Sequence, residues 1–289
     1  MAYFLLFTSL FIEVLKNVYL NHFGKDYTKS PTDAYLFNAV STFGGLILLV
    51  CLRPQLQISG FSFWLSVCFA LASAMAQYCL LMSMATGSMS YSVLISYLGM
   101  LIPTSYSIVC SKSVTVYQLI GLALMVLTIY LGVGAKNDSK ISVRWLIYSA
   151  VSFISWGLVG LIQLLHQASP YKNESSGFLI WSFVFMVVLF LLMHCFAGRK
   201  QTELSHYRLK SKATFFVLGA GVFVGATNKI NLYLSGVLPG IVLFPIVNGG
   251  VIVLSGIASV LFFKEKLSRM QMIGILIGIL SICLLGITK

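Results

Sequence analysis

Three ionisable side chains lie inside long apolar runs of this chain: Glu13, Lys16 and Lys229. A charged group in an apolar medium costs roughly 3 kcal/mol or more unless it faces a wet cavity or a partner, so each is a candidate functional residue. Glu13 could bind a proton or a cationic group. Lys229, with Asn228 and Asn231 beside it, could bind a carboxylate, a phosphate or hydroxyl groups.

A purely structural role is the alternative for the same residues. Glu13 and Lys16 lie one helical turn apart and could neutralise one another, and the asparagines could simply hydrogen bond to neighbouring helices. The chain shows no pattern that resembles a metal cluster, a nucleophile with its base or a phosphate-binding loop. We therefore expect no enzymatic activity, no catalytic residue, no metal and no cofactor.

Polar side chains recur at intervals of three and four residues in several apolar runs, which places them on one face of each helix. The run from residue 3 to 22 carries Ser9, Glu13, Lys16, Asn17 and Asn21. Such a face cannot look toward lipid. If these faces converge, they enclose a polar cavity at mid-membrane. The candidate substrate- or ion-binding residues are Glu13, Lys16, Asn17, Gln77, Trp156, Gln163, Asn228, Lys229, Asn231 and Asn248.

Prolines and glycines within the runs indicate helix shape and packing. Pro103 and Pro245 each free a backbone carbonyl and permit a kink, which could serve a moving gate or only shape the helix. Gly221 and Gly225, like Gly274 and Gly278, stand four residues apart and permit close helix contact. We expect these glycines to serve internal packing, with a dimer face as the alternative.

Ten apolar stretches must position these residues, each near the ~20 residues that a helix needs to cross a bilayer. The chain has 289 residues, of which 58% are hydrophobic and 9% charged, with a mean hydropathy of +0.94. This composition excludes a soluble protein and predicts an all-α integral membrane protein. The expected spans are 3–22, 33–52, 61–84, 88–110, 115–134, 144–166, 177–197, 213–235, 238–263 and 269–287.

The second five stretches repeat the first five at an offset of 153 positions. At this offset Gln118, Ile120 and Gly121 meet Gln271, Ile273 and Gly274 without a gap. A unit with an odd number of spans, once duplicated, must sit upside down relative to its copy. The sequence therefore predicts one membrane unit of two inverted five-helix repeats, residues 1–135 and 136–289, an architecture typical of carriers that alternate access to a central site.

The net charge of +12 would suggest a nucleic-acid partner in a soluble protein, but the basic residues lie mostly in short loops, where they set orientation. By the positive-inside rule the side with more Lys and Arg residues is cytoplasmic, and both termini then lie outside. That side carries thirteen residues: Lys25, Lys29, Lys136, Lys140, Arg144, Arg199, Lys200, Arg208, Lys210, Lys212, Lys264, Lys266 and Arg269. The other side carries four: Arg53, Lys112, Lys172 and Lys289.

With its repeat, its short turns at Gly87 and Gly240, and the segment 263–268 followed by Gln271 and Gly274, the chain resembles the drug/metabolite transporter superfamily, EamA type. The first half departs from that pattern, since Lys112 stands where Glu265 stands in the second. The resemblance implies ten spans and a secondary carrier whose cavity is lined by spans 1, 3, 4, 6, 8 and 9. It also implies cytoplasmic termini, against the charge count.

The acidic residue of the first span adds a further likeness, because Glu13-Val14 resembles the acidic position that small multidrug resistance proteins of the same superfamily use for proton exchange. We therefore predict a proton-coupled carrier in the cell membrane, a monomer or homodimer, that exports a small polar metabolite such as an amino acid or a sugar-like compound. An exporter of apolar cations, a facilitator or uptake carrier, and a non-transporting receptor or assembly factor are the alternatives.

Overall fold

The computed structural model describes residues 1–27, 31–87, 89–110, 115–133, 142–198, 211–264 and 268–285, and all regular structure within these ranges is helical. Two helices, η1 and η2, are short 3₁₀ turns. The elements are α1 (Ala2–Tyr27), α2 (Pro31–Leu52), α3 (Gly60–Thr86), α4 (Met89–Tyr97), η1 (Leu98–Met100), α5 (Leu101–Cys110), α6 (Val116–Val133), α7 (Val143–Ala168), η2 (Lys172–Glu174), α8 (Ser175–Gly198), α9 (Ser211–Ser235), α10 (Gly240–Phe263) and α11 (Arg269–Leu285).

Seven segments of the described chain are helical, long and apolar enough to cross a membrane: Ala2–His22, Thr32–Leu52, Gly60–Thr86, Ser92–Cys110, Val143–Ala168, Lys172–Ala197 and Gly240–Phe262. Large apolar side chains such as Phe4, Phe7 and Phe11 of α1 and Trp64 of α3 are exposed on the outer surface. Water would penalise so much exposed apolar area, whereas lipid chains accept it. The prediction of an all-helical, multi-pass membrane protein is therefore confirmed.

Three helices that coincide with expected spans lie outside those seven. The apolar parts of α6 and α11 are shorter, Val116–Thr128 and Met272–Ser281. Helix α9 carries Asn228, Lys229 and Asn231, and it packs against α1, α2, α7, α8 and α10. A helix enclosed by protein on most sides does not need the apolar surface that lipid demands, so the polar residues of α9 are compatible with its place in the bundle.

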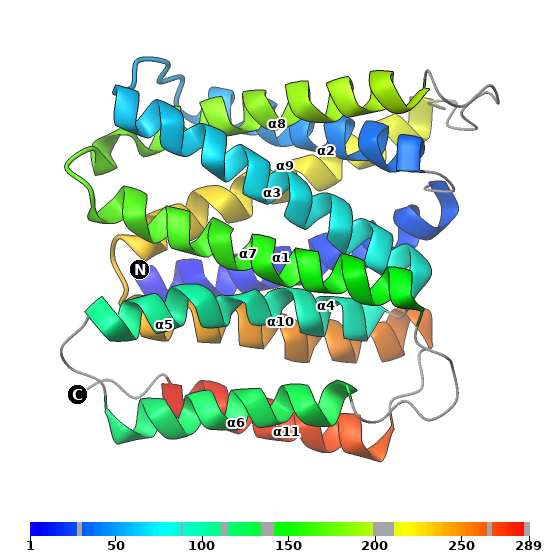
Figure 1. Ribbon diagram of the computed structural model, residues 1–289, viewed down its shortest axis with the longest axis vertical. Coiled ribbons are helices and arrows are strands. Elements are labelled where there is room, and N and C mark those ends of the chain that lie inside the picture. The colour runs from blue at the N-terminus through cyan, green and yellow to red at the C-terminus, as the bar shows by residue number, and fades with distance from the viewer. Residues whose placement is uncertain are drawn as a thin grey trace.

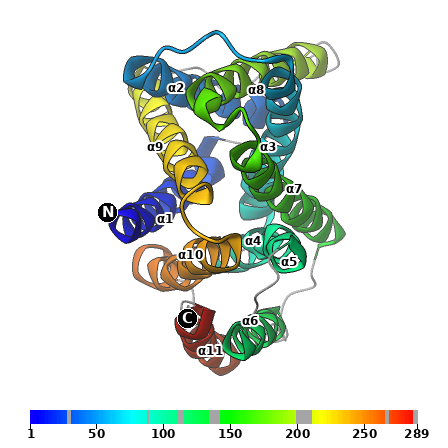
Figure 2. The same ribbon diagram turned by 90° about the vertical axis from the view of Figure 1, so that its left-hand side faces the viewer.

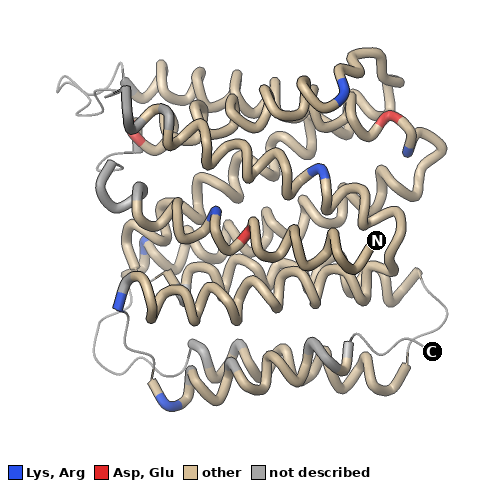
Figure 3. Tube along the Cα trace, turned by 180° about the vertical axis from the view of Figure 1, so that it is seen from behind, with Lys and Arg blue, Asp and Glu red and all other residues tan. Residues whose placement is uncertain are grey.

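The helices lie side by side in a layered bundle (Figure 1). Viewed along the helices, α2 and α8 form one end, α10 lies with α4 and α5 in a lower layer, and α6 pairs with α11 at the far end (Figure 2). Helix α1 begins and α11 ends on the same side of the bundle (Figure 1). Charged residues gather toward the two ends of the helices, with few between them (Figure 3).

Close helix contact at glycines holds α9 against α2. A Cβ on Gly221 would collide with the Ser41 carbonyl oxygen, and one on Gly225 would come within 3 Å of Gly45 backbone atoms. Only glycine permits backbones to approach this closely. Gly278 of the second glycine pair likewise lies against Thr128 of α6. The expected role of the glycines in internal packing is confirmed.

The expected span 88–110 is interrupted where α4 ends and α5 begins. Pro103, the third residue of α5, cannot donate a hydrogen bond to the carbonyl of Gly99, and the 3₁₀ turn Leu98–Met100 occupies that position. Gly99 also packs tightly against Phe153 and Gly157 of α7. Pro245, in contrast, lies within the uninterrupted helix α10. The kink expected at Pro103 therefore has a counterpart in the structure, next to the candidate site.

Candidate functional site

A cavity lies among α1, α4, η1, α5, α7, α9 and α10, and contains about 620 Å³ of empty space, counted out to its opening. Its apolar walls come mainly from α7 and α10, and its polar groups come from α1, α4, α7, α9 and α10. The lining residues are Glu13, Tyr97, Met100, Pro103, Trp156, Val159, Gly160, Gln163, Thr227, Asn228, Asn231, Leu243, Phe244, Val247 and Asn248.

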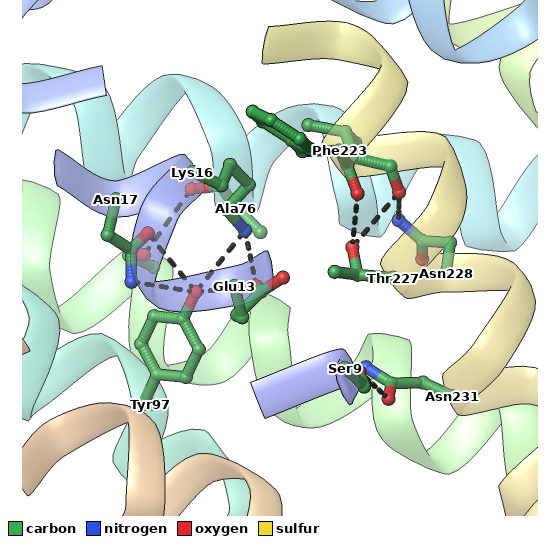
Figure 4. Close-up of polar contacts among 12 residues, drawn as sticks. Ser9, Glu13, Lys16, Asn17, Ala76, Tyr97, Phe223, Thr227, Asn228 and Asn231 are labelled. Atoms are coloured by element: carbon green, nitrogen blue, oxygen red, sulfur yellow. Dashed lines mark hydrogen bonds and ion pairs between the residues drawn. The ribbon is translucent and has the colours of Figure 1, made fainter. Parts of the chain in front are cut away.

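On the α1 side of the cavity, Glu13 is the centre of a buried network. Its Oε1 is paired with the Lys16 ammonium and accepts a 2.6 Å hydrogen bond from the Tyr97 hydroxyl. Lys16 Nζ lies 3.3 Å from the same hydroxyl, and Asn17 Nδ2 lies 3.2 Å from it (Figure 4). All four side chains are at least nine-tenths buried. A buried ion pair of this kind is tolerated because both charges also have hydrogen-bond partners.

Two buried polar atoms at the cavity wall have no partner among the described residues: Glu13 Oε2 and Trp156 Nε1. In Figure 4 the free carboxylate oxygen points across the gap toward α9, where Thr227 and Asn228 lie. Trp156 is stacked on Tyr97, with ring centroids 5.7 Å apart. Buried polar groups are almost always satisfied in folded proteins, so an unpaired acceptor and an unpaired donor at one cavity indicate a place for a polar ligand or water.

The opposite wall of the cavity is formed by amide side chains. Gln163 Nε2 lies 3.5 Å from Asn228 Oδ1, and Asn231 Oδ1 accepts a 2.6 Å hydrogen bond from Ser9 of α1. Asn228 and Asn248 each donate Nδ2 to the carbonyl four residues earlier in their own helix. These bonds fix the side-chain orientations and leave amide atoms facing the cavity.

Seven of the sequence-predicted residues therefore meet at one cavity, and five do not line it. Lys16 and Asn17 lie directly behind Glu13 and hold it through the network described above. Gln77 is buried on α3, a helix that contributes nothing to the lining although the resemblance implied it would. Lys229 and Pro245 are also absent from it. The seven that line the cavity are Glu13, Pro103, Trp156, Gln163, Asn228, Asn231 and Asn248.

Lys229 differs most from its predicted place. Its ammonium donates a hydrogen bond to the hydroxyl of Ser176, the second residue of α8. The side chain thus extends toward the start of α8 and not toward Asn228 and Asn231, with which it was expected to bind a substrate. In the described chain the walls of the cavity carry no lysine or arginine.

Tyr97 and Thr227 are the polar lining residues that sequence reasoning missed. Tyr97 follows directly on Ser96, which belongs to a stripe of small and polar residues at 92, 96 and 99, and Thr227 precedes Asn228. In a chain with 14 tyrosines nothing distinguished Tyr97 from its neighbours in sequence. As for metals, the described residues contain no group of three His, Cys, Asp or Glu side chains that could hold an ion.

Among known proteins, one relative is similar in sequence over part of its length, and one solved structure has a similar fold. No family model matches the chain. It is 34% identical over 140 residues to a protein of Bacillus subtilis (strain 168) named "Uncharacterized transporter YojE"; the match covers 47% of this chain and 44% of the relative. A solved structure described only as "Crystal structure of protein" is similar with a TM-score of 0.68 and 14% identity, over 98% of this chain and 96% of the other. That likeness concerns the fold alone.

Proposed function

We propose that this protein is a secondary active transporter that exports a small polar metabolite, coupled to the proton gradient, by alternating access to the cavity around Glu13. The observation that carries the proposal is a cavity with several polar side chains at its wall inside a bundle of apolar helices, with a carboxylate oxygen of Glu13 left free there. Ionisable groups kept inside a membrane at such a cavity are typical of transport pathways. The name of the B. subtilis relative points the same way.

Helix packing supports two inverted repeats, α1–α6 and α7–α11, with ten crossings in all. A two-fold relation between the halves requires every contact between unlike helices to have an exchanged counterpart. Helix α2 packs on α9 and α8 packs on α3; α1 packs on α9 and α7 packs on α3; α1 packs on α10 and α7 packs on α4 and α5. Such exchange is expected of halves related by a two-fold axis. Five crossings in each half would invert one copy relative to the other and put that axis in the membrane plane, the arrangement of many carriers that alternate between two access states.

The Glu13–Lys16 pair supplies a route for proton coupling. A proton that binds the free Oε2 neutralises the carboxylate and leaves the Lys16 ammonium without its counter-charge. A buried cation without a partner is costly. The protonated protein therefore favours a conformation in which the Lys16 ammonium is better solvated or is paired with another group. A ligand drives a conformational change only through such a difference between states.

We further propose that the protein lies in the cell membrane and is a member of the drug/metabolite transporter superfamily, EamA type. Arg144, Lys264 and Arg269 lie where α7 begins, α10 ends and α11 begins, opposite the side on which α1 begins. Arg53 and Lys172 lie on the α1-start side. This distribution supports termini outside. Most of the other basic loop residues, among them Lys136, Lys140 and those at 199–210, lie outside the described residues.

Export of apolar cations is less well supported. Tyr97 and Trp156 provide aromatic rings next to Glu13, but Lys16 Nζ already lies 5.0 Å from the Trp156 ring centroid and 5.9 Å from that of Tyr97. A cationic drug would meet a second positive charge there. A receptor or assembly factor would use an exposed recognition surface and has no need of a cavity with polar side chains inside the bundle.

The test is proton movement in proteoliposomes that carry a trapped pH indicator, with small polar metabolites added one at a time. We expect a substrate-dependent pH change with the parent protein and none with Glu13→Gln. Glu174→Gln is the matched control, because that carboxylate is bonded to Ser59 at the end of the bundle and lies outside the cavity. If Glu13→Gln folds poorly, the double variant with Lys16→Met keeps the site neutral. Unchanged proton movement in a Glu13 variant would refute the coupling.

A further inference from the structure

We propose that the substrate of this cavity is uncharged: a small hydroxyl- or amide-bearing molecule that donates a hydrogen bond to Glu13 Oε2 and accepts one from Trp156 Nε1. The inference rests on the proposed transport function and narrows it, since amino acids and organic ions are excluded. It follows from the charges around the cavity, from the atoms that remain unpaired at its wall, and from its size.

The charges beside the cavity cancel. Among the described residues that line the cavity, Glu13 is the one with a charged side chain. Its Oε1 is paired with the Lys16 ammonium, which lies behind it. A cationic ligand would gain attraction from Glu13 and lose it to repulsion by Lys16. An anionic ligand would find no lysine or arginine at the described wall. Moving an ion out of water costs several kcal/mol, and the cavity offers no net countercharge to offset that cost.

Lys229 does not change this balance. Its ammonium is hydrogen bonded to Ser176 of α8, and neither residue lines the cavity. Lys229, which the sequence predicted to bind a carboxylate of the substrate, therefore binds Ser176 outside the cavity. A zwitterionic amino acid would leave its carboxylate without a cation, so the expectation of an amino acid substrate loses its main support.

The unpaired atoms at the wall suit an uncharged polar molecule. Glu13 Oε2 accepts hydrogen bonds, Trp156 Nε1 donates one, and both are buried without a partner among the described residues. Asn231 and Asn248 each use one amide atom in a described hydrogen bond and keep the other available. A hydroxyl both donates and accepts, and an amide does the same through two atoms, so either satisfies this mixed set.

The size of the cavity favours a compact molecule. The space open to the centre of a water molecule is about 40 Å³. That is room for roughly three water molecules, so in this conformation the cavity seats a small polyol or the polar head of a larger one that extends to the opening.

Four molecules of nearly the same size separate charge from shape: glycerol, which is uncharged; serinol, in which an ammonium replaces the central hydroxyl; glycerate, in which a carboxylate replaces one end; and serine, which carries both charges. Saturable binding is measured as thermal stabilisation of purified protein in detergent, and uptake is measured with labelled probes in proteoliposomes. We expect glycerol to bind and to be taken up best.

Variants show whether binding occurs at this wall. Trp156→Phe keeps an aromatic side chain but replaces the indole by a smaller phenyl ring and removes the Nε1 donor. We expect it to weaken glycerol binding at least roughly three- to tenfold, through the loss of one hydrogen bond and of part of the ring contact. Lys229→Met is the matched control and should leave binding unchanged. Polyols also stabilise proteins in general, but this effect does not saturate and is the same in both variants. The difference between Trp156→Phe and Lys229→Met therefore reports binding at the cavity wall.

Preferred binding of serinol, glycerate or serine would overturn the inference and leave the transport function intact, because the carrier would then act on an ion. Saturable binding of none of the four, or equal glycerol binding by Trp156→Phe and the parent, would overturn it as well. The transport function fails separately, when no tested metabolite moves protons or label across the membrane.

Discussion

The surroundings of Lys16 and of Lys229 differ although both lysines lie within helices of the bundle. Lys16 is 2% exposed, is paired with Glu13 and lies over the rings of Tyr97 and Trp156. Lys229 is partly exposed, and its ammonium is bonded to a neutral hydroxyl at the start of α8. The first lysine is therefore part of the charge balance of the cavity, and the second is not.

The difference shows that the neighbours in three dimensions decide whether an ionisable residue in a span contributes to the cavity. Lys16 has a carboxylate one turn away, and that carboxylate has a second oxygen facing the cavity. Lys229 lies nearer the end of its helix, where its long side chain reaches the level at which α8 begins. Long basic side chains near helix ends commonly extend in this way toward the polar boundary.

The largest effect is expected from Lys16→Met, because it leaves the Glu13 carboxylate buried without a counter-charge. The free energy of unfolding should fall by about 3–5 kcal/mol. It is measured by denaturant unfolding of purified protein in mixed micelles. The double variant Glu13→Gln with Lys16→Met removes both charges and should recover most of that loss. A double variant no more stable than Lys16→Met alone would show that the ion pair does not hold the site.

A smaller effect is expected from Tyr97→Phe, which keeps the ring stacked on Trp156 and removes the hydroxyl shared by Glu13, Lys16 and Asn17. Loss of a hydrogen bond to a buried charged group should cost about 1–3 kcal/mol in the free energy of unfolding. The same unfolding assay measures it, and Tyr130→Phe on α6, where the side chain is 73% exposed, serves as control. A loss equal to that of the control would contradict a role for this hydroxyl in holding Glu13.

The smallest effects are expected on the Lys229 side. Lys229→Met and Ser176→Ala each remove one partner of a partly exposed hydrogen bond, so each should lower the free energy of unfolding by about 1 kcal/mol or less. Neither should alter substrate affinity in the binding assay. A large loss of affinity in Lys229→Met would erase the contrast with Lys16 and return Lys229 to the substrate site.

Much of the cavity was foreseeable from helical periodicity. Glu13, Lys16 and Asn17 were expected on one face of the first helix, and they share one network. Trp156 and Gln163 of α7 were predicted as binding residues, and both line the cavity. Polar residues spaced by three or four in an apolar helix must turn toward protein, so these residues needed no knowledge of their neighbours.

Lys229 shows where periodicity was applied too loosely. Asn228 and Asn231 stand three apart and share a face, but Lys229 is rotated from Asn228 by about 100°. Adjacent residues in a helix never share one direction, and the face that Lys229 occupies could be assigned only once α8 was seen beside α9. Tyr97 was missed for the opposite reason, since an aromatic residue in an apolar run gives no sign of a polar partner.

The sequence by itself determined that the chain is helical, that it belongs in a membrane, and which faces of its helices avoid lipid, because these properties depend on local composition and on the 3.6-residue period. Tertiary structure alone decided which polar residues meet. Glu13 and Lys16 pair within one helix, but whether Glu13 keeps a free oxygen at a cavity and whether Lys229 reaches that cavity depend on helices distant in sequence. Hydrogen bonds need donor and acceptor within about 3.2 Å, and ion pairs weaken as the charges separate, so only the packing of the bundle sets which groups interact across helices.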